Sequence, residues 1–185
     1  MSAERLFRKL KEALDAAKIP YMVTGSFVSA LHGVPRATHD IDVVIAPSGE
    51  QIDALLKQFA ESDYFVEPED AMQALRHRTQ FNVIDQHSIW KIDFILRKER
   101  PFSRAEFERR VLVNILGVSV YAAAPEDILL AKLEWAKLGE SERQIKDAAG
   151  IIEIQRDKLD MNYVDRWVEL LDIQPQWEAA RAMAG

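Results

Sequence analysis

The sequence has 185 residues, of which 48% are hydrophobic and 29% are charged, as is usual for a globular protein with one core of ordinary size. The net charge of −6 argues against extensive nucleic-acid binding, because proteins that bind a long nucleic acid usually present a basic surface. The absence of cysteine excludes disulfides, thiolate metal sites and a cysteine nucleophile. No segment has the apolar run of a signal peptide or a membrane span, so we expect a cytoplasmic protein without membrane contact.

The first two thirds of the chain alternate segments of helical and strand periodicity. Leucines at helical spacing predict an amphipathic helix over residues 1–19. The other helices predicted in this part are 26–33, 47–62, 67–78 and 103–110. The predicted strands are 20–24, 40–46, 79–85 and 88–97, followed by two strands that turn near Gly117 within 111–123. Residues 79–97 are expected to form a hairpin.

From Pro125 the pattern changes to successive helices with no convincing strand between them. These helices are predicted over 125–139, 141–156, 161–173 and 175–185. The fold class is therefore α+β, with a mixed β-sheet flanked by helices in a domain of residues 1–124. Residues 125–185 are expected to form a helical extension that packs on it.

An acidic pattern interrupts the apolar strand over 40–46. The side chains of Asp40 and Asp42 project from the same face of that strand, where the two carboxylates repel each other unless a positive group lies between them. Gly25 and Ser26 lie where a strand passes into a helix, and the backbone N–H groups of a helix start form an anion site. If the strand carrying Asp93 lies beside the first, three carboxylates converge there. Such oxygen ligands suit Mg²⁺ or Mn²⁺ and the clamping of a nucleoside triphosphate.

This arrangement resembles the polymerase-β-type nucleotidyltransferases, whose signature is a Gly-Ser turn, an Asp-x-Asp and a distant acidic residue. The flank RATHDIDVVI resembles the Arg-x-Thr-x-Asp-h-Asp form (h, apolar) of the AbiEii-like branch, known from abortive infection and toxin–antitoxin systems. Three further segments resemble motifs of that branch: WKIDFI, PEDILLAKL and RQIKDAAGII. The resemblance therefore runs from about residue 21 to residue 152. Many AbiEii-like proteins have a larger C-terminal helical domain, so the acceptor is not carried over.

The resemblance implies the nucleotidyltransferase fold and Mg²⁺- or Mn²⁺-dependent transfer of a nucleoside monophosphate from an NTP to a hydroxyl acceptor. That acceptor is an RNA, a protein or a small molecule, in a toxin–antitoxin or phage-defence setting. Asp40, Asp42 and Asp93 are the implied catalytic residues and metal ligands, with Asp93 also the general base. The implied nucleotide-binding residues are Gly25, Ser26, Arg36, Thr38, Lys132 and Lys146.

Two alternatives stay open. One is an antibiotic-modifying nucleotidyltransferase of the aminoglycoside or lincosamide type, because an acidic cleft suits a cationic drug. The other is a non-catalytic binding module that keeps the fold. In that case Lys91 and Asp93 form an ordinary surface ion pair, and Lys132 and Lys146 are solvated helix charges. Unused clustered carboxylates cost stability, which argues against the module.

Overall fold

The computed structural model describes residues 3–60 and 63–185. They form two compact units. Unit 1 comprises the residues up to Gly25 together with Thr38–Ala122, and unit 2 comprises Ser26–Ala37 together with Ala123–Gly185. The predicted division into domains 1–124 and 125–185, with the second packed on the first, stays a prediction. The predicted helix ends at residues 1–2 and 61–62 lie outside the described residues.

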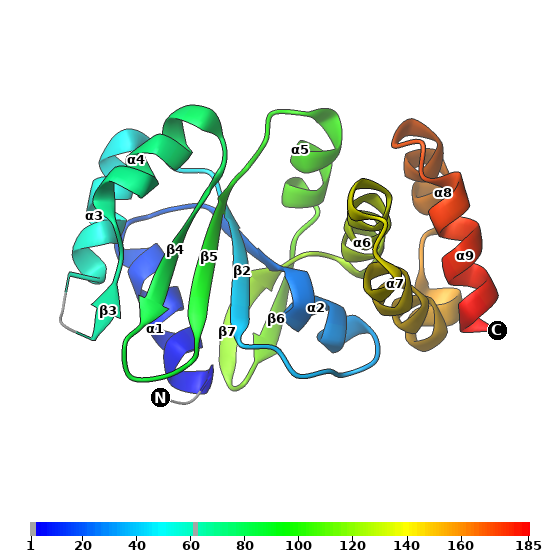
Figure 1. Ribbon diagram of the computed structural model, residues 1–185, viewed down its shortest axis with the longest axis horizontal. Helices are drawn as coiled ribbons and strands as arrows, with labels where there is room; N and C mark the ends of the chain where they lie inside the picture. Colours follow the sequence, from blue (N-terminus) through cyan, green and yellow to red (C-terminus); the bar gives the residue numbers. More distant parts are fainter. Residues whose placement is uncertain (1–2, 61–62) are drawn as a thin grey trace. The chain divides into compact units, whose positions relative to one another are not determined.

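Unit 1 is built on a seven-stranded mixed sheet with the strand order β3-β4-β5-β2-β1-β7-β6 (Figure 1). Two neighbouring pairs, β2 with β5 and β1 with β7, are parallel, and the other four pairs are antiparallel. The predicted mixed sheet and both predicted hairpins, β4–β5 and β6–β7, are confirmed. The strands are β1 (Tyr21–Thr24), β2 (Asp40–Ile45), β3 (Tyr64–Phe65), β4 (Gln80–Asp85), β5 (Lys91–Leu96), β6 (Val111–Ile115) and β7 (Val118–Ala122).

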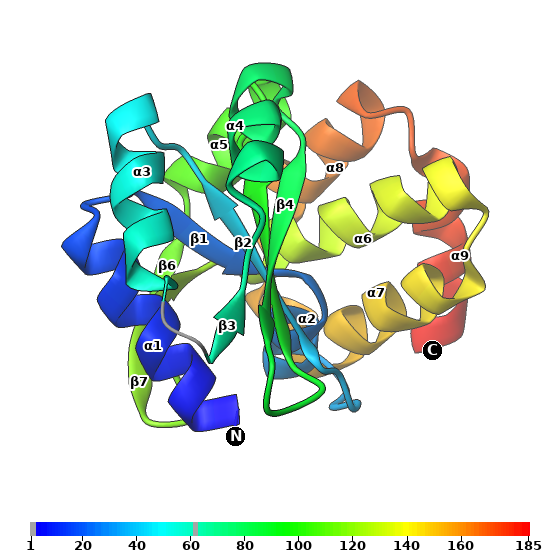
Figure 2. The ribbon, with the colours of Figure 1, turned by 60° about the vertical axis from the view of Figure 1, so that its left-hand side comes forward.

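The helices of unit 1 bury the apolar side of the sheet strands. In β2, Ile41, Val43 and Ile45 are fully buried, while Asp40 and Asp42 stay partly exposed, as strand alternation predicts. Helix α3 packs between α1 and α4, and Figure 2 shows α1 and α3 side by side. The helices are α1 (Ala3–Ala16), α3 (Gly49–Gln58), α4 (Pro68–His77) and α5 (Pro101–Glu108).

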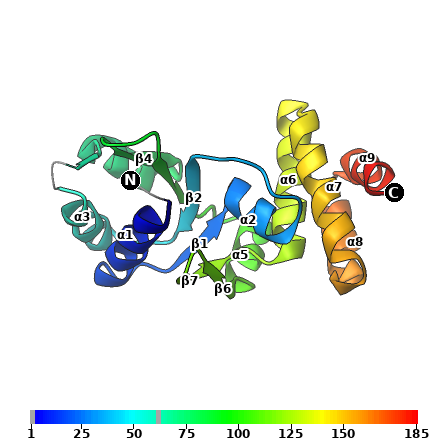
Figure 3. The same ribbon diagram turned by 90° about the horizontal axis from the view of Figure 1, so that it is seen from below.

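Unit 2 is helical. Helix α7 packs against α6 and α9 (Figure 3), and α6 also contacts α8. The segment after α2 approaches α7 closely, because a Cβ added at Gly33 would lie 2.9 Å from the backbone nitrogen of Ile151. None of the helices in the part of the chain that the structure describes could cross a membrane. The elements are α2 (Gly25–His32), whose first residue belongs to unit 1, α6 (Pro125–Gly139), α7 (Glu142–Gln155), the 3-10 helix η1 (Arg156–Lys158), α8 (Met161–Leu170) and α9 (Gln174–Ala184).

Candidate active site

The three predicted carboxylates lie on two neighbouring strands. Strands β2 and β5 run parallel, with Asp42 directly beside Asp93 and Asp40 beside Lys91. The expectation that the strand of Asp93 lies beside the Asp-x-Asp strand is therefore confirmed. Residues paired across neighbouring strands project from the same face of a sheet, so all four side chains share the face opposite the apolar core.

Polar residues also lie on the strands to either side of β2 and β5, in register with Asp42 and Asp93. Thr24 of β1 pairs with Asp42, and Asn82 of β4 pairs with Asp93. We call the sequence Asn82–Asp93–Asp42–Thr24, which crosses β4, β5, β2 and β1, the polar row. Gly25 follows Thr24 directly and begins α2. The predicted phosphate-binding turn thus stands at one end of the polar row, and β4 stands at the other.

Lys91 supplies the positive group that the aspartates require. Its Nζ lies 2.7 Å from Oδ2 of Asp93 and 3.7 Å from Oδ1 of Asp40. Burial alone would lower the pKa of Lys91, but the hydrogen bond to Asp93 and the charges of Asp93, Asp40 and Asp42 outweigh it and raise that pKa. Lys91 and Asp93 are therefore paired, as in the non-catalytic alternative, but Asp93 is buried, so this is not the surface ion pair of that alternative. The pairing is compatible with a carboxylate cluster built to hold positive charge.

Asp93 is the most buried of the three carboxylate residues. The residue is 7% exposed, and its Oδ1 atom is buried without a hydrogen-bond partner among the described residues. A buried carboxylate oxygen without a partner is costly, since it has lost its hydration and gained nothing in return. Such an atom is well suited to accept a ligand or a proton.

Gly25 touches the carboxylate of Asp42. The backbone of Gly25 has a φ of +68°, and a Cβ placed on it would lie 1.9 Å from Oδ2 of Asp42. Only glycine fits this position, because it tolerates the left-handed backbone and has no side chain to strike the carboxylate. At the start of β2, the Oγ1 of Thr38 accepts a hydrogen bond from the backbone N–H of Asp40 at 3.4 Å.

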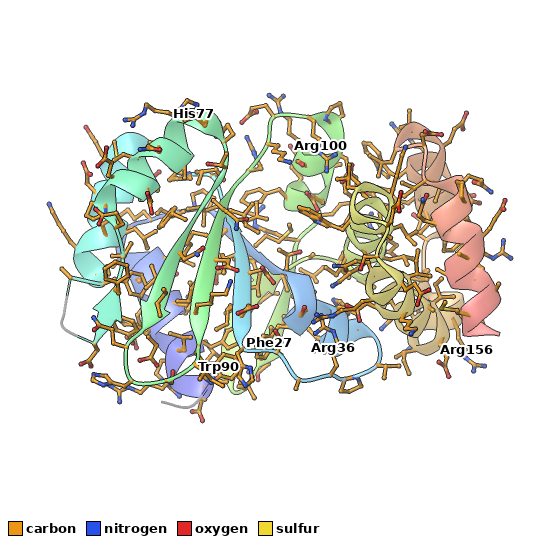
Figure 4. The ribbon with its side chains drawn as sticks, in the orientation of Figure 1. Phe27, Arg36, His77, Trp90, Arg100 and Arg156 are labelled. Atoms are coloured by element: carbon orange, nitrogen blue, oxygen red, sulfur yellow. The ribbon has the colours of Figure 1, made fainter. Side chains whose placement is uncertain are left out.

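In unit 2, three of the predicted or resembling motif residues form an ion-pair network. Nζ of Lys132 lies 2.8 Å from Oδ2 of Asp147, and Nε of Arg36 lies 3.2 Å from Oδ1 of the same carboxylate. Arg36, labelled in Figure 4, also donates to the hydroxyl of Ser26. Burial raises the pKa of Asp147, but the hydrogen bonds and charges of Lys132 and Arg36 outweigh it and lower that pKa. Lys146 is exposed on α7.

Sequence reasoning missed one contact and one acidic residue of structural importance. Asp147 was recognised within a motif, but its hydrogen bond from Arg36 spans 111 residues, and no local pattern reveals such a contact. Asp85 is 1% exposed and fixes the β4–β5 turn, because it accepts hydrogen bonds from the backbone N–H of His87 (3.0 Å) and the hydroxyl of Ser88 (2.6 Å). An aspartate followed within three residues by serine is a turn signal that could have found it.

The chemistry of the polar face fits a divalent cation. Asp40, Asp42 and Asp93 offer the carboxylate oxygens that Mg²⁺ prefers. Oδ1 of Asp93 is buried without a hydrogen-bond partner in the part of the chain that the structure describes, and the ammonium group of Lys91 lies against Asp40 and Asp93. As the side chains stand, no three His, Asp or Glu residues within 3–60 and 63–185 form a ready metal cluster. A divalent ion would therefore have to compete with the ammonium of Lys91.

Comparison with solved structures finds the same fold in nucleotidyltransferases. The crystal structure of ANT(2″)-Ia in complex with adenylyl-2″-tobramycin is 15% identical with a TM-score of 0.60, covering 93% of this chain and 98% of that one. An antigenic nucleotidyltransferase-like protein from Paracoccidioides brasiliensis is 19% identical with a TM-score of 0.57, covering 96% and 90%. The predicted nucleotidyltransferase fold is confirmed, whereas a search of curated protein sequences found no match. The family model described as nucleotidyltransferase of unknown function (DUF6036) matches residues 2–183, so this chain belongs to that family of nucleotidyltransferases.

Proposed function

We propose that this chain transfers a nucleoside monophosphate from an NTP to a hydroxyl acceptor in a Mg²⁺-dependent reaction. The observation that carries the proposal is the position of Asp42, which lies in register beside Asp93 on one side and touches Gly25 on the other. A carboxylate in this position connects a metal-binding face to a helix start that can hold phosphate oxygens.

Asp40, Asp42 and Asp93 are the proposed ligands of Mg²⁺, for which Mn²⁺ can substitute. The bound ion would supply positive charge to the triphosphate and to the departing pyrophosphate. Gly25 has no side chain of its own, so its backbone can lie directly against the carboxylate of Asp42, where a bound ion would also meet the phosphate oxygens. Asp93 accepts the proton of the acceptor hydroxyl through Oδ1, which has no hydrogen-bond partner within residues 3–60 and 63–185.

The transfer needs no reactant other than the NTP and the acceptor hydroxyl. The acceptor oxygen forms a bond to the α-phosphorus, the bond from that phosphorus to the pyrophosphate breaks, and the hydroxyl proton passes to Asp93. Before substrate arrives, the ammonium of Lys91 neutralises part of the negative charge on this face. Substrate binding frees Lys91 from that role, and its charge becomes available to the phosphates.

The remaining roles rest on the resemblance to the AbiEii-like branch alone. In unit 2, Arg36 and Lys132 are held by Asp147, so binding of phosphate by either residue has to compete with an internal ion pair. The toxin–antitoxin or phage-defence setting is proposed on the same ground. The proposed nucleotide ligands in this class are Ser26, Arg36, Thr38, Lys132 and Lys146.

Isothermal titration calorimetry tests the proposal. ATP, CTP, GTP and UTP are titrated with Mg²⁺ into the wild type, the Asp40→Ala/Asp42→Ala variant and Glu108→Gln, which removes an exposed acid of α5. We expect Mg²⁺-dependent binding of at least one NTP to the wild type and to Glu108→Gln. The double variant should bind at least about tenfold more weakly, which corresponds to about 1.4 kcal/mol. If no NTP binds to folded wild type at millimolar concentration, the non-catalytic module replaces the enzyme.

A further inference from the structure

The ammonium group of Lys91 lies among the three carboxylates that are the proposed metal ligands. Its Nζ lies 2.7 Å from Oδ2 of Asp93 and 3.7 Å from Oδ1 of Asp40. Asp42 pairs with Asp93 across β2 and β5, and its negative charge also acts on Lys91. An internal cation thus lies where the site would hold a divalent one.

The backbone of Lys91 is held by both neighbouring strands, whereas its side chain can move. Its N–H donates to the carbonyl oxygen of His39 at 3.1 Å, and the residue pairs with Asp40 of β2 and with Ile84 of β4. The ring of Trp90, labelled in Figure 4, contacts the ring of His39 with 5.3 Å between the centroids. The lysine side chain is 36% exposed, and its four-carbon stem is flexible. The ammonium can therefore leave the carboxylates by side-chain rotation alone, without a movement of the strands.

Lys91 acts in opposite directions on a free metal ion and on a nucleotide. Without its ammonium, this face of the sheet would carry one more unit of negative charge. A divalent cation would then bind more strongly, since it would no longer meet a like charge at short range. A triphosphate, in contrast, would lose the one cation of this cluster and meet only carboxylates. The lysine therefore opposes the binding of metal alone and favours the binding of phosphates.

We infer that Lys91 makes metal binding conditional on the nucleotide, so that the site takes Mg²⁺ as its complex with an NTP and disfavours Mg²⁺ alone. The inference rests on the proposed function, because it takes Asp40, Asp42 and Asp93 as the metal ligands. When a triphosphate arrives, the ammonium turns from Asp93 to a phosphate oxygen, and the carboxylate oxygen that it leaves becomes available as a ligand. Lys91 thereby determines the specificity of the site for the metal–nucleotide complex.

Two binding measurements on Lys91→Met test this inference. Electron paramagnetic resonance of free Mn²⁺ gives the affinity for the metal alone, without any nucleotide. Calorimetry with excess Mn²⁺ gives the affinity for the α,β-methylene analogues of ATP, CTP, GTP and UTP, which do not transfer the nucleotide. We expect the variant to bind Mn²⁺ alone at least about tenfold more tightly than the wild type, and the analogue at least about tenfold more weakly. A merely structural role of Lys91 would weaken both affinities together.

Two further variants serve as matched controls. Lys91→Arg keeps a positive charge beside Asp93, so its affinity for Mn²⁺ alone should stay close to that of the wild type. Lys98→Met removes an exposed lysine just beyond the end of β5 and should change neither affinity.

The wild type provides a second measurement, which does not depend on the folding of Lys91→Met. NMR of protein labelled with ¹³C-lysine follows the Cε–Hε signal of Lys91, which is identified by its absence in Lys91→Arg. We expect Mg²⁺ alone to leave this signal in place and Mg²⁺ with an NTP analogue to shift it, because only the phosphates draw the ammonium away from Asp93.

The outcomes separate this inference from the proposed function. The inference is overturned if Mg²⁺ alone shifts the Lys91 signal as far as Mg²⁺ with the analogue does. It is also overturned if Lys91→Met folds and leaves the affinity for Mn²⁺ alone unchanged or weaker. In both cases, metal-dependent binding of an analogue to the wild type leaves the nucleotidyltransferase proposal standing. A wild type that binds no analogue in the presence of metal overturns the proposed function and this inference together.

Discussion

Replacing Asp147 by asparagine should destabilise unit 2 by about 3 kcal/mol. The substitution removes the carboxylate that binds Lys132, whose side chain is only 6% exposed, and Arg36, whose side chain is 24% exposed. Breaking a buried ion pair by removing one partner costs about 3–5 kcal/mol, because the remaining buried charge loses the opposite charge that offset its desolvation. We expect the lower end of that range, since Arg36 can turn toward solvent. For a chain of this size the melting temperature should fall by about 6–12 °C.

Urea unfolding followed by tryptophan fluorescence measures this loss. Three of the four tryptophans, Trp135, Trp167 and Trp177, belong to unit 2, so the signal reports mainly on the unit that carries the change. The matched control is Asp165→Asn, an exposed acid of α8 whose replacement should change the unfolding free energy by less than about 0.5 kcal/mol.

A double variant and a pH series sharpen the test. Lys132→Met/Asp147→Leu removes both charges and should recover most of the loss, because apolar residues of similar volume often replace buried ion pairs without cost. The pKa of Asp147 in the folded state is lowered below its ordinary value of 3.8, so its contribution is complete above that pH and is lost as the pH falls further. A loss below about 1 kcal/mol for Asp147→Asn, or a double variant weaker than the single one, would refute the reasoning.

Three further predictions concern single positions. Gly25→Ala should cost about 1–2 kcal/mol from the left-handed backbone, and it should abolish Mg²⁺·NTP binding in calorimetry because the new Cβ displaces Asp42; retained binding would contradict the close contact. Burial lowers the pKa of His32 below 6.5 and outweighs the hydrogen bond to the carbonyl of Ala123, so the contribution of His32 to the free energy of unfolding is complete above pH 6.5 and is lost at lower pH. Thermal melts between pH 7.5 and 5 should therefore show a flatter pH profile for His32→Gln than for the wild type. Ser48→Ala removes the capping box of α3 and should lower the stability by about 1 kcal/mol in urea unfolding, while an unchanged midpoint would show that the cap contributes nothing.

The sequence predicted the strand faces of the site because alternation is a local property. Placing Asp40 and Asp42 on one face of β2 needed only the period of two residues, and the order of Gly25, Asp42 and Asp93 along the chain identified the family pattern. The neighbour relation of β2 and β5 could be stated only as a condition, since strand order depends on contacts between distant segments. It was then confirmed by the structure.

Contacts that depend on three-dimensional packing could not be predicted. The approach of Gly25 to Asp42 requires the exact path of the chain at the start of α2, and the pairing of Arg36 with Asp147 requires the packing of α7 in unit 2. Strand β3 is too short, at two residues, to show any alternation. Lys91 was recognised as a partner of Asp93, but its additional approach to Asp40 follows only from the pairing register.

The short turn between β4 and β5 constrains how this family can vary in length. Only residues 86–90 separate the two strands, and Asp85 fixes the path between them through His87 and Ser88. A shift of β5 by one position would turn Asp93 into the apolar core, because every side chain of a slipped strand changes face. Functional homologues should therefore keep this turn length constant or change it together with a compensating β-bulge, and protein engineers should place loop insertions elsewhere.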